Sequence, residues 1–116
     1  MENGEEVIIR VDIDRTLCDW KRDERGKKVA IPKQDVISKV NRLYREGHRI
    51  VIWTSRNNIS RRDQTAFTTG QLRKWGVKYH ELDMKKPLFD LFVDDKAVNV
   101  DHWMKGIPIP GMDYNE

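Results

Sequence analysis

The chain has 116 residues and a single cysteine, so it fits one domain with a core of its own and no internal disulfide. Its net charge of +3 comes from 22 basic and 19 acidic residues, and this balance argues against a nucleic-acid-binding protein. No apolar stretch approaches the length of a membrane span or of a signal-peptide core. We therefore expect a cytoplasmic protein that makes no membrane contact.

Four apolar runs predict strands. They lie at residues 7–11, 49–53, 78–82 and 91–93, and β-branched residues are concentrated in the first two. Between those two, apolar residues at helical spacing predict a helix over residues 33–46. Pro32 stands near its start, and Gly47 stands where a left-handed cap would end it.

Two more helices are predicted further along the chain. One is expected to begin at a capping box formed by Thr68 and Gln71 and to end at Gly76, and a shorter one is expected near Pro87. Strands that alternate with helices argue for an α/β fold with right-handed crossovers. The sequence thus predicts a single three-layer, Rossmann-like domain whose mostly parallel sheet is covered on both faces.

Two polar stretches interrupt this pattern. Residues 15–32 lack a sustained helical period and hold Arg25-Gly26-Lys27 at their middle, so we expect a short projecting hairpin, or flap, above the end of the first strand. Its local excess of positive charge is typical of a solvated hairpin tip. Residues 56–63 are expected to form a loop at the same edge. Neither stretch is long enough to form a cap domain.

Polar residues follow three of the predicted strands. Asp12 and Asp14 follow the first, Thr54, Ser55 and Arg56 follow the second, and Asp94 and Asp95 follow the last, with Lys85 and Lys86 upstream of that pair. Because the carboxyl ends of parallel strands share one edge of a sheet, we expect these groups at one rim. Carboxylates there can hold Mg²⁺, a hydroxyl can bind phosphate oxygens, and a lysine can neutralise a transferred phosphoryl group. The pattern favours phosphoryl transfer.

In this order, Asp12-Ile13-Asp14-Arg15-Thr16, Thr54, Lys86 and Asp94-Asp95 resemble the four motifs of the haloacid dehalogenase superfamily of phosphohydrolases. The resemblance covers nearly the whole chain. Matches in residues 41–48, 53–56, 71–79 and 86–90 resemble small cap-less members associated with capsular or other surface-polysaccharide synthesis. What the resemblance implies is a Mg²⁺-dependent phosphatase that hydrolyses a phosphomonoester, with a small sugar phosphate as the expected substrate.

The resemblance also implies roles for the matched residues. Asp12 would be the nucleophile that carries an aspartyl-phosphate, and Asp14 would be the general acid and then the general base. Thr54 would bind a phosphate oxygen. Lys86, or Lys85 if the register slips by one, would neutralise charge at the site.

For the metal, the resemblance implies that Mg²⁺ would be held by Asp12, Asp14, Asp94 and Asp95, the last directly or through water. The neighbours Arg15, Thr16, Ser55 and Arg56 are the candidates for substrate binding. Arg15 stands where many superfamily members have glycine, so the turn there must tolerate a side chain. Without a cap, access to the site would be controlled by the flap, by a homo-oligomeric partner or by the substrate itself.

Two other functions stay open from the sequence. A phosphatase acting on nucleotides or nucleic-acid ends would use the uncapped rim and the basic flap, but no wider basic stripe accompanies them. A receiver-like signalling domain shares the length, the sheet type and the acidic Mg²⁺ pocket. In a receiver domain the phospho-accepting aspartate is expected alone after a middle strand, whereas here the acid pair comes late in the chain.

Overall fold

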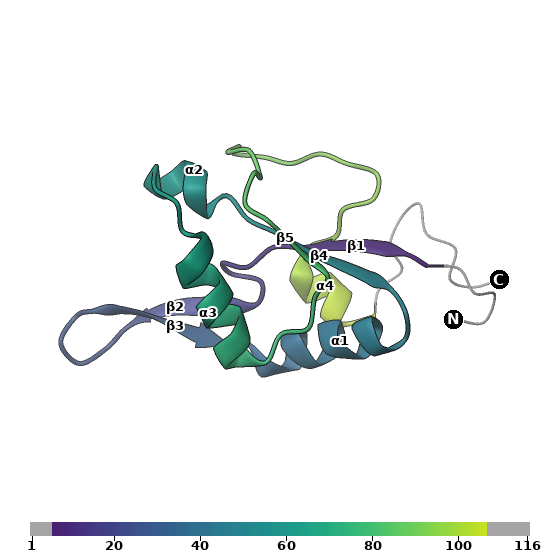
Figure 1. Cartoon of the computed structure of the whole chain (residues 1–116), viewed down its shortest axis with the longest axis horizontal. Helices are drawn as coiled ribbons and strands as arrows, with labels where there is room; N and C mark the ends of the chain where they lie inside the picture. Colours follow the sequence, from purple (N-terminus) through teal and green to yellow (C-terminus); the bar gives the residue numbers. More distant parts are fainter. Residues whose placement is uncertain (1–5, 107–116) are drawn as a thin grey trace.

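The main sheet consists of three parallel strands in a computed structural model that describes residues 6–106. The strands β1 (Ile8–Val11), β4 (Arg49–Trp53) and β5 (Glu81–Asp83) lie in the order β1-β4-β5 (Figure 1). Ile9 pairs with Ile50 between β1 and β4, and Ile52 pairs with Leu82 between β4 and β5. This register places the carboxyl ends of β1 and β4 next to each other at one edge of the sheet.

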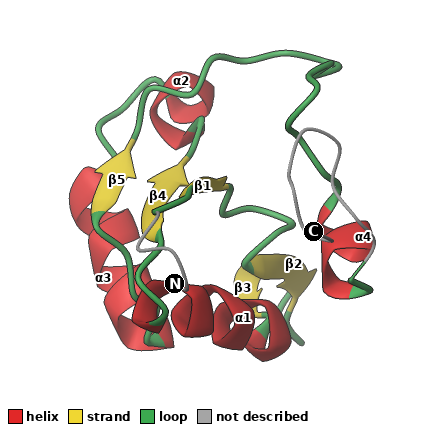
Figure 2. Cartoon of the chain, turned by 90° about the vertical axis from the view of Figure 1, so that its right-hand side faces the viewer, coloured by secondary structure: helices red, strands yellow, loops and turns green. Residues whose placement is uncertain are grey.

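Two helices cover the same face of this sheet. They are α1 (Gln34–Arg45), which connects β1 with β4 after the hairpin, and α3 (Thr65–Trp75), which precedes β5. Alternate strand residues share one core with both helices; its members include Ile9, Val11, Ile50, Ile52 and Leu82 from the sheet, Val36 and Val40 from α1, and Leu72 and Trp75 from α3. Because side chains alternate across a strand, these strand residues define one face, and both helices pack on it (Figure 2).

Irregular backbone lies on the opposite face of the sheet and leaves part of it open, with Ile8 63% exposed. Residues 84–99 run from β5 to the short helix α4 (Val100–Met104) and arch over that side (Figures 1 and 2). The ring of Phe92 meets that of Trp53 there, with centroids 6.2 Å apart. The α/β class and the parallel sheet are confirmed, whereas the prediction of helices on both faces is wrong for residues 6–106, because the chain after β5 forms no further strand and its short helix α4 packs on the same core as α1.

An antiparallel hairpin projects from the body of the molecule within the polar stretch 15–32. Its strands are β2 (Cys18–Arg22) and β3 (Lys28–Pro32), and they pair from Cys18 with Pro32 to Arg22 with Lys28 (Figure 1). The Asp23 carboxylate accepts the backbone N–H groups of two residues in the turn, Arg25 and Lys27. This pattern is an aspartate turn, which closes a tight loop locally.

The predicted helix over residues 33–46 is confirmed as α1, and both predicted glycine stops are present. Gly47 has φ of 98° and Gly76 has φ of 73°, a left-handed conformation that costs glycine little. The predicted capping box is wrong, because α3 begins at Thr65 and Thr68 is a buried residue inside it. The Asp63 carboxylate accepts the N–H of Thr65 at that start instead. No helix among the described residues is long and apolar enough to cross a membrane.

Four further local predictions are corrected by the structure. The strand expected at 78–82 is the shorter β5, because only the last three residues of β4 have a partner there. Residues 56–63, expected as a loop, begin with the single-turn helix α2 (Arg56–Ser60), while no helix forms near Pro87. The strand expected at 91–93 is absent, with Leu91 78% and Val93 85% exposed. Strand propensity is realised only where a neighbour pairs with the segment, and none does here.

Candidate active site

Asp12 and Asp14 lie in the tight loop that follows β1. The carbonyl oxygen of Ile13, which is fully buried, accepts three N–H groups from the next turn, those of Thr16, Leu17 and Cys18. The two aspartates flank this buried anchor, and about a third of each side chain stays exposed. Arg15 has φ of 64°, a left-handed conformation that is strained for a side-chain-bearing residue and natural for glycine.

Lys86 lies beside Asp12. Its Nζ is 3.5 Å from Asp12 Oδ1, and 14% of the lysine side chain is exposed. Burial raises the pKa of Asp12 above its ordinary value of 3.8, and the charge of Lys86 opposes that rise only in part. A half-desolvated carboxylate next to a lysine is a suitable nucleophile for an anionic phosphate, because the lysine offsets the repulsion between two negative groups.

The segment that carries Lys86 is tied to the end of β4. The backbone N–H of Lys86 donates to the carbonyl oxygen of Thr54 at 3.2 Å, and Asn58 Nδ2 donates to the carbonyl oxygen of Lys86 at 2.7 Å. The Lys86 ammonium also lies 5.2 Å from the centre of the Trp53 ring. Lys85 is exposed, and its N–H donates to Asp83. Of the two candidate lysines, Lys86 is therefore the one beside Asp12.

Thr54 is the buried hydroxyl at the end of β4. Its side chain is 1% exposed, its N–H donates to the carbonyl oxygen of Asp83, and its Oγ1 accepts the N–H of Arg56. Next to it, Ser55 Oγ donates to the carbonyl oxygen of Pro87 at 3.3 Å. Strand β4 thus holds the second motif and the lysine-bearing segment at the same edge as the loop after β1.

Asp14 accepts hydrogen bonds from two different parts of the chain. Arg56 binds it with two nitrogens, Nε to Oδ2 at 3.1 Å and Nη2 to Oδ1 at 2.9 Å, and Trp20 Nε1 of β2 donates to Oδ1 at 2.8 Å. Burial by itself would raise the pKa of Asp14, but these donors outweigh it and hold the pKa below the ordinary 3.8. At neutral pH the carboxylate is therefore charged and fixed in orientation.

Cys18 packs behind this loop and is fully buried. Its Sγ lies 3.8 Å from both the Ile13 carbonyl oxygen and Asp14 Oδ1. Burial, with the nearby negative charge of Asp14, raises the pKa of the thiol to about 11. The thiolate fraction at neutral pH is consequently very small, so Cys18 is a packing residue.

Asp94 and Asp95 do not lie with the other acids. Both are exposed in the irregular segment, and Asp94 Oδ1 accepts the N–H of Lys96, a contact within its own turn. Within residues 6–106, no three His, Cys, Asp or Glu side chains are close enough together to hold a metal ion. The expected meeting of all four acids at one rim is therefore not observed, because the strand that would deliver the last pair is not formed.

The four candidates for substrate binding lie in different environments. Arg15 is exposed at the loop after β1, while Thr16 and Ser55 are half-buried. Arg56 is 8% exposed, and its donors contact protein groups: Nη1 donates to Thr68 Oγ1 at 3.1 Å and to Gln71 Oε1 at 2.7 Å, in addition to the contacts with Asp14. Their role in substrate binding stays a prediction.

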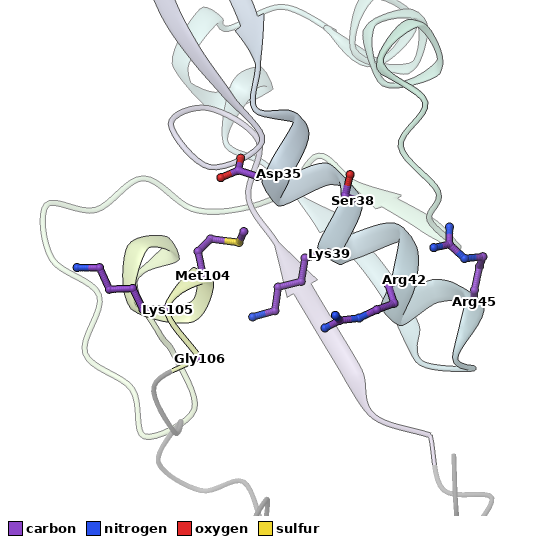
Figure 3. Close-up of a pocket in the computed structure, with 8 residues that line it drawn as sticks. All are labelled: Asp35, Ser38, Lys39, Arg42, Arg45, Met104, Lys105 and Gly106. Carbon is purple, nitrogen blue, oxygen red and sulfur yellow. The ribbon is translucent and has the colours of Figure 1, made fainter.

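A separate surface hollow of about 530 Å³ lies between α1 and α4. Figure 3 shows Lys39 and Arg42 of α1 and Met104 of α4 around it. The Lys39 ammonium lies over the Trp103 ring at 4.3 Å and donates to the carbonyl oxygen of that residue. None of the predicted site residues lines this hollow, so the acid-bearing edge of the sheet is the candidate site.

Comparison with solved structures identifies a neighbour that shares the fold. The crystal structure of an MCSG target from Vibrio cholerae superposes with a TM-score of 0.73 and 26% sequence identity, over 84% of this chain and 87% of that one. No protein-family model and no curated protein matches the chain. The described fold is thus shared with a known protein over most of both lengths.

Sequence reasoning did not identify the partners of Asp14. The sequence predicts Thr68 in a helix cap and gives no partner for Trp20, yet Trp20 contacts Asp14 and Thr68 contacts Arg56. Trp20 is six residues and Arg56 is 42 residues from Asp14, so no local spacing connects them. One signal in the sequence could have suggested the contact between Arg56 and Asp14: an arginine follows the end of β4, and its side chain is long enough to reach the acid-bearing loop after β1.

Proposed function

We propose that this protein is a phosphatase that hydrolyses a phosphomonoester through an aspartyl-phosphate on Asp12. The observation that carries the proposal is the pairing of Asp12 with Lys86 at 3.5 Å, beside Thr54 and at the carboxyl ends of two adjacent parallel strands. In open α/β sheets this edge is where ligands bind. The order of the three elements along the chain also supports the haloacid dehalogenase type of phosphohydrolase suggested by the motifs.

In the first step, a carboxylate oxygen of Asp12 attacks phosphorus, and the bond between phosphorus and the leaving oxygen breaks. Asp14 is charged at rest because Arg56 and Trp20 lower its pKa, so it first takes a proton from solvent or from the substrate monoanion and then gives it to that oxygen, which leaves as an alcohol. In this proposal Lys86 supplies positive charge to the phosphoryl oxygens during the transfer, and the motif resemblance assigns the Thr54 hydroxyl to bind one of them. The product of this step is the phosphorylated Asp12.

In the second step, Asp14 takes a proton from a water molecule, and the oxygen of that water attacks phosphorus. The bond between phosphorus and Asp12 breaks, so inorganic phosphate is released and the Asp12 carboxylate is restored. The low pKa of Asp14 suits this second step, because the group is ready to accept a proton at neutral pH. Asp14 ends this step protonated, and it returns that proton to solvent or gives it to the next leaving group.

A Mg²⁺ requirement is part of the proposal and rests on the sequence motifs. As placed, the acids do not fit the ion, since Mg²⁺ takes six oxygens in near-octahedral geometry, both Asp14 oxygens are held by Arg56, and no three acid side chains within residues 6–106 lie close enough together to bind it. No step above is routed through the metal. Asp94 and Asp95 are the donors that the motif order assigns to it.

The proposed substrate is a small phosphorylated metabolite, with a sugar phosphate favoured by the motif resemblance. About a third of the side chains of Asp12 and Asp14 is exposed, which leaves the phosphoryl site open to solvent. The same openness would admit a nucleotide or a nucleic-acid end, so the substrate is a question for experiment. The proposal places the enzyme in the cytoplasm, as expected from the sequence.

The test is phosphate release from a panel of sugar phosphates, nucleotides and 3'-phosphorylated oligonucleotides, with and without Mg²⁺. We expect turnover of at least one sugar phosphate, activation by Mg²⁺, and a loss of about 10³-fold or more in kcat for Asp12→Asn. Asp19→Asn is the matched control, because Asp19 is an exposed aspartate of the hairpin with the same side chain.

The outcomes separate the candidate functions. Turnover that Asp12→Asn retains would contradict the nucleophile, and preference for the oligonucleotide with strong salt dependence would favour the nucleic-acid substrate. Stable labelling of Asp12 by acetyl phosphate without turnover of any ester would favour the receiver-like domain. No phosphate release from any substrate by the folded protein with Mg²⁺ would contradict the phosphatase proposal.

A further inference from the structure

The side chain of Arg56 is anchored more completely than a substrate-binding residue requires. It makes four hydrogen bonds to three residues, two to Asp14, one to Thr68 and one to Gln71, and 8% of it is exposed. A guanidinium has five N–H groups, so these contacts occupy most of its donors. The Arg56 side chain is thus held between Asp14 and the two residues of α3.

The contacts are distributed unequally over the two oxygens of Asp14. Oδ1 accepts from Trp20 Nε1 at 2.8 Å and from Arg56 Nη2 at 2.9 Å, and Cys18 Sγ lies 3.8 Å away. Among residues 6–106, Oδ2 accepts only from Arg56 Nε, at 3.1 Å. Since each carboxylate oxygen can accept about two hydrogen bonds, Oδ1 is saturated and Oδ2 keeps a free lone pair.

We propose that Arg56 and Trp20 are positioning residues for the proposed reaction, which fix the Asp14 carboxylate so that Oδ2 is the oxygen that exchanges a proton with the leaving group and with water. The proposal rests on the phosphatase function and adds the residues that orient its acid and base. A two-nitrogen contact from a planar guanidinium defines the carboxylate plane, and the indole N–H then distinguishes its two oxygens.

The arrangement also connects the acid and base with the flap. Trp20 lies on β2 of the hairpin, the Lys28 ammonium on β3 lies 5.1 Å from its ring centre, and its indole reaches back to Asp14. A displacement of the hairpin therefore removes one donor from Asp14 without touching Asp12 or Lys86. Through the contact between Trp20 and Asp14, the position of the flap affects the orientation of Asp14, whether or not the flap contacts substrate.

An orientation role predicts a dependence on the leaving group. An alkyl phosphate, such as a sugar phosphate, needs a proton on its leaving oxygen, whereas p-nitrophenol leaves readily without one, so only the first reaction needs a well-placed acid. A residue that only stabilises the fold would affect both substrates equally. The two substrates therefore distinguish positioning from general stabilisation.

The experiment measures kcat and KM of wild type, Arg56→Lys and Trp20→Phe on the best sugar phosphate and on p-nitrophenyl phosphate. For Arg56→Lys we expect kcat on the sugar phosphate to fall about 10²-fold, a fall at least 10-fold greater than on p-nitrophenyl phosphate, with KM unchanged within about 3-fold. Lysine keeps the charge but cannot make the two-nitrogen contact, so it should not restore the kcat on the sugar phosphate. Trp20→Phe should show the same selective loss on a smaller scale.

Matched controls are the exposed arginine Arg62, replaced by Lys, and the tryptophan of α4, Trp103, replaced by Phe. Both should behave like wild type on both substrates. Thermal unfolding identifies variants that fail to fold; if Arg56→Lys is one of them, Trp20→Phe on the hairpin carries the test.

Equal losses on the two substrates, or a loss confined to KM, would overturn the positioning role while leaving the phosphatase function intact. Asp12→Asn is assayed in parallel to tell the two apart. If it keeps turnover, or if wild type turns over neither substrate, the phosphatase function fails and the positioning role fails with it.

Discussion

Acid residues follow apolar runs in two regions of the molecule: the edge at the carboxyl ends of β1 and β4, and the irregular segment 84–99. The acids of the two regions have different surroundings. At the first, Asp12 and Asp14 follow a strand whose alternate residues are buried, and Lys86, Trp20 and Arg56 contact them. In the second, Asp94 and Asp95 follow an apolar run that pairs with no strand among residues 6–106.

The difference teaches that a carboxylate after an apolar run becomes part of a site only when the run is paired and packed. A paired strand holds the backbone at its end in a defined position, so the side chains that follow it lie at a defined edge of the sheet. An unpaired apolar segment gives its acids no such position, and here they lie in solvent. Even Lys86, whose segment is also irregular, is held by its N–H bond to Thr54 at the end of β4. Three of the four motif positions meet for this reason, and the fourth does not.

The largest effect that tests this comparison is a matched pair of leucine truncations. Leu72 is fully buried in α3, so Leu72→Ala should lower the free energy of unfolding by about 2–5 kcal/mol. Leu91 is 78% exposed, so Leu91→Ala should change it by less than about 0.5 kcal/mol. Urea unfolding followed by circular dichroism measures both. A cost above about 1 kcal/mol for Leu91→Ala would show that the segment is buried in solution.

An intermediate effect is expected for the acid pair itself. The double variant Asp94→Asn/Asp95→Asn should leave the melting temperature unchanged within about 2 °C, since both side chains are exposed. If the pair supplies metal ligands as proposed, the Mg²⁺ concentration for half-maximal phosphatase activity should rise about 10-fold or more. Mg²⁺ titrations of activity and of tryptophan fluorescence check this. An unchanged Mg²⁺ response, with Asp101→Asn as the control, would remove the pair from the metal site.

The smallest expected effect is a pH dependence of stability at Asp14. Its pKa is lowered in the folded chain, so the unfolded chain binds this proton more tightly. The stabilisation is therefore complete above the unfolded value of about 3.8 and is lost as the pH falls through the folded value. When the pH falls from about 6 to 3, the free energy of unfolding of Asp14→Asn should decrease by about 1 kcal/mol less than that of wild type. A parallel pH profile of the two proteins would contradict the ion pair with Arg56.

Much of the framework could be predicted because it depends on local periodicity. The α1 helix, its glycine stop at Gly47, strand β4 and the polar hairpin all follow from patterns within about a dozen residues. The errors lie where a local signal competed with a distant contact. Thr68 and Gln71 had the spacing of a capping box, but Thr68 is buried within α3 and both side chains accept from Arg56.

By itself, the sequence determined the α/β class, the parallel pairing of the first strands and the meeting of Asp12 with the end of β4, because strand and helix periods are properties of neighbouring residues. Only the tertiary structure decided which lysine faces Asp12, which side chains hold Asp14 and that the acid pair at 94 and 95 stays apart. These depend on contacts between residues tens of positions apart, such as Arg56 with Asp14. Long-range contacts of this kind leave no period in the sequence, since they depend on the shape and charge of elements that folding brings together.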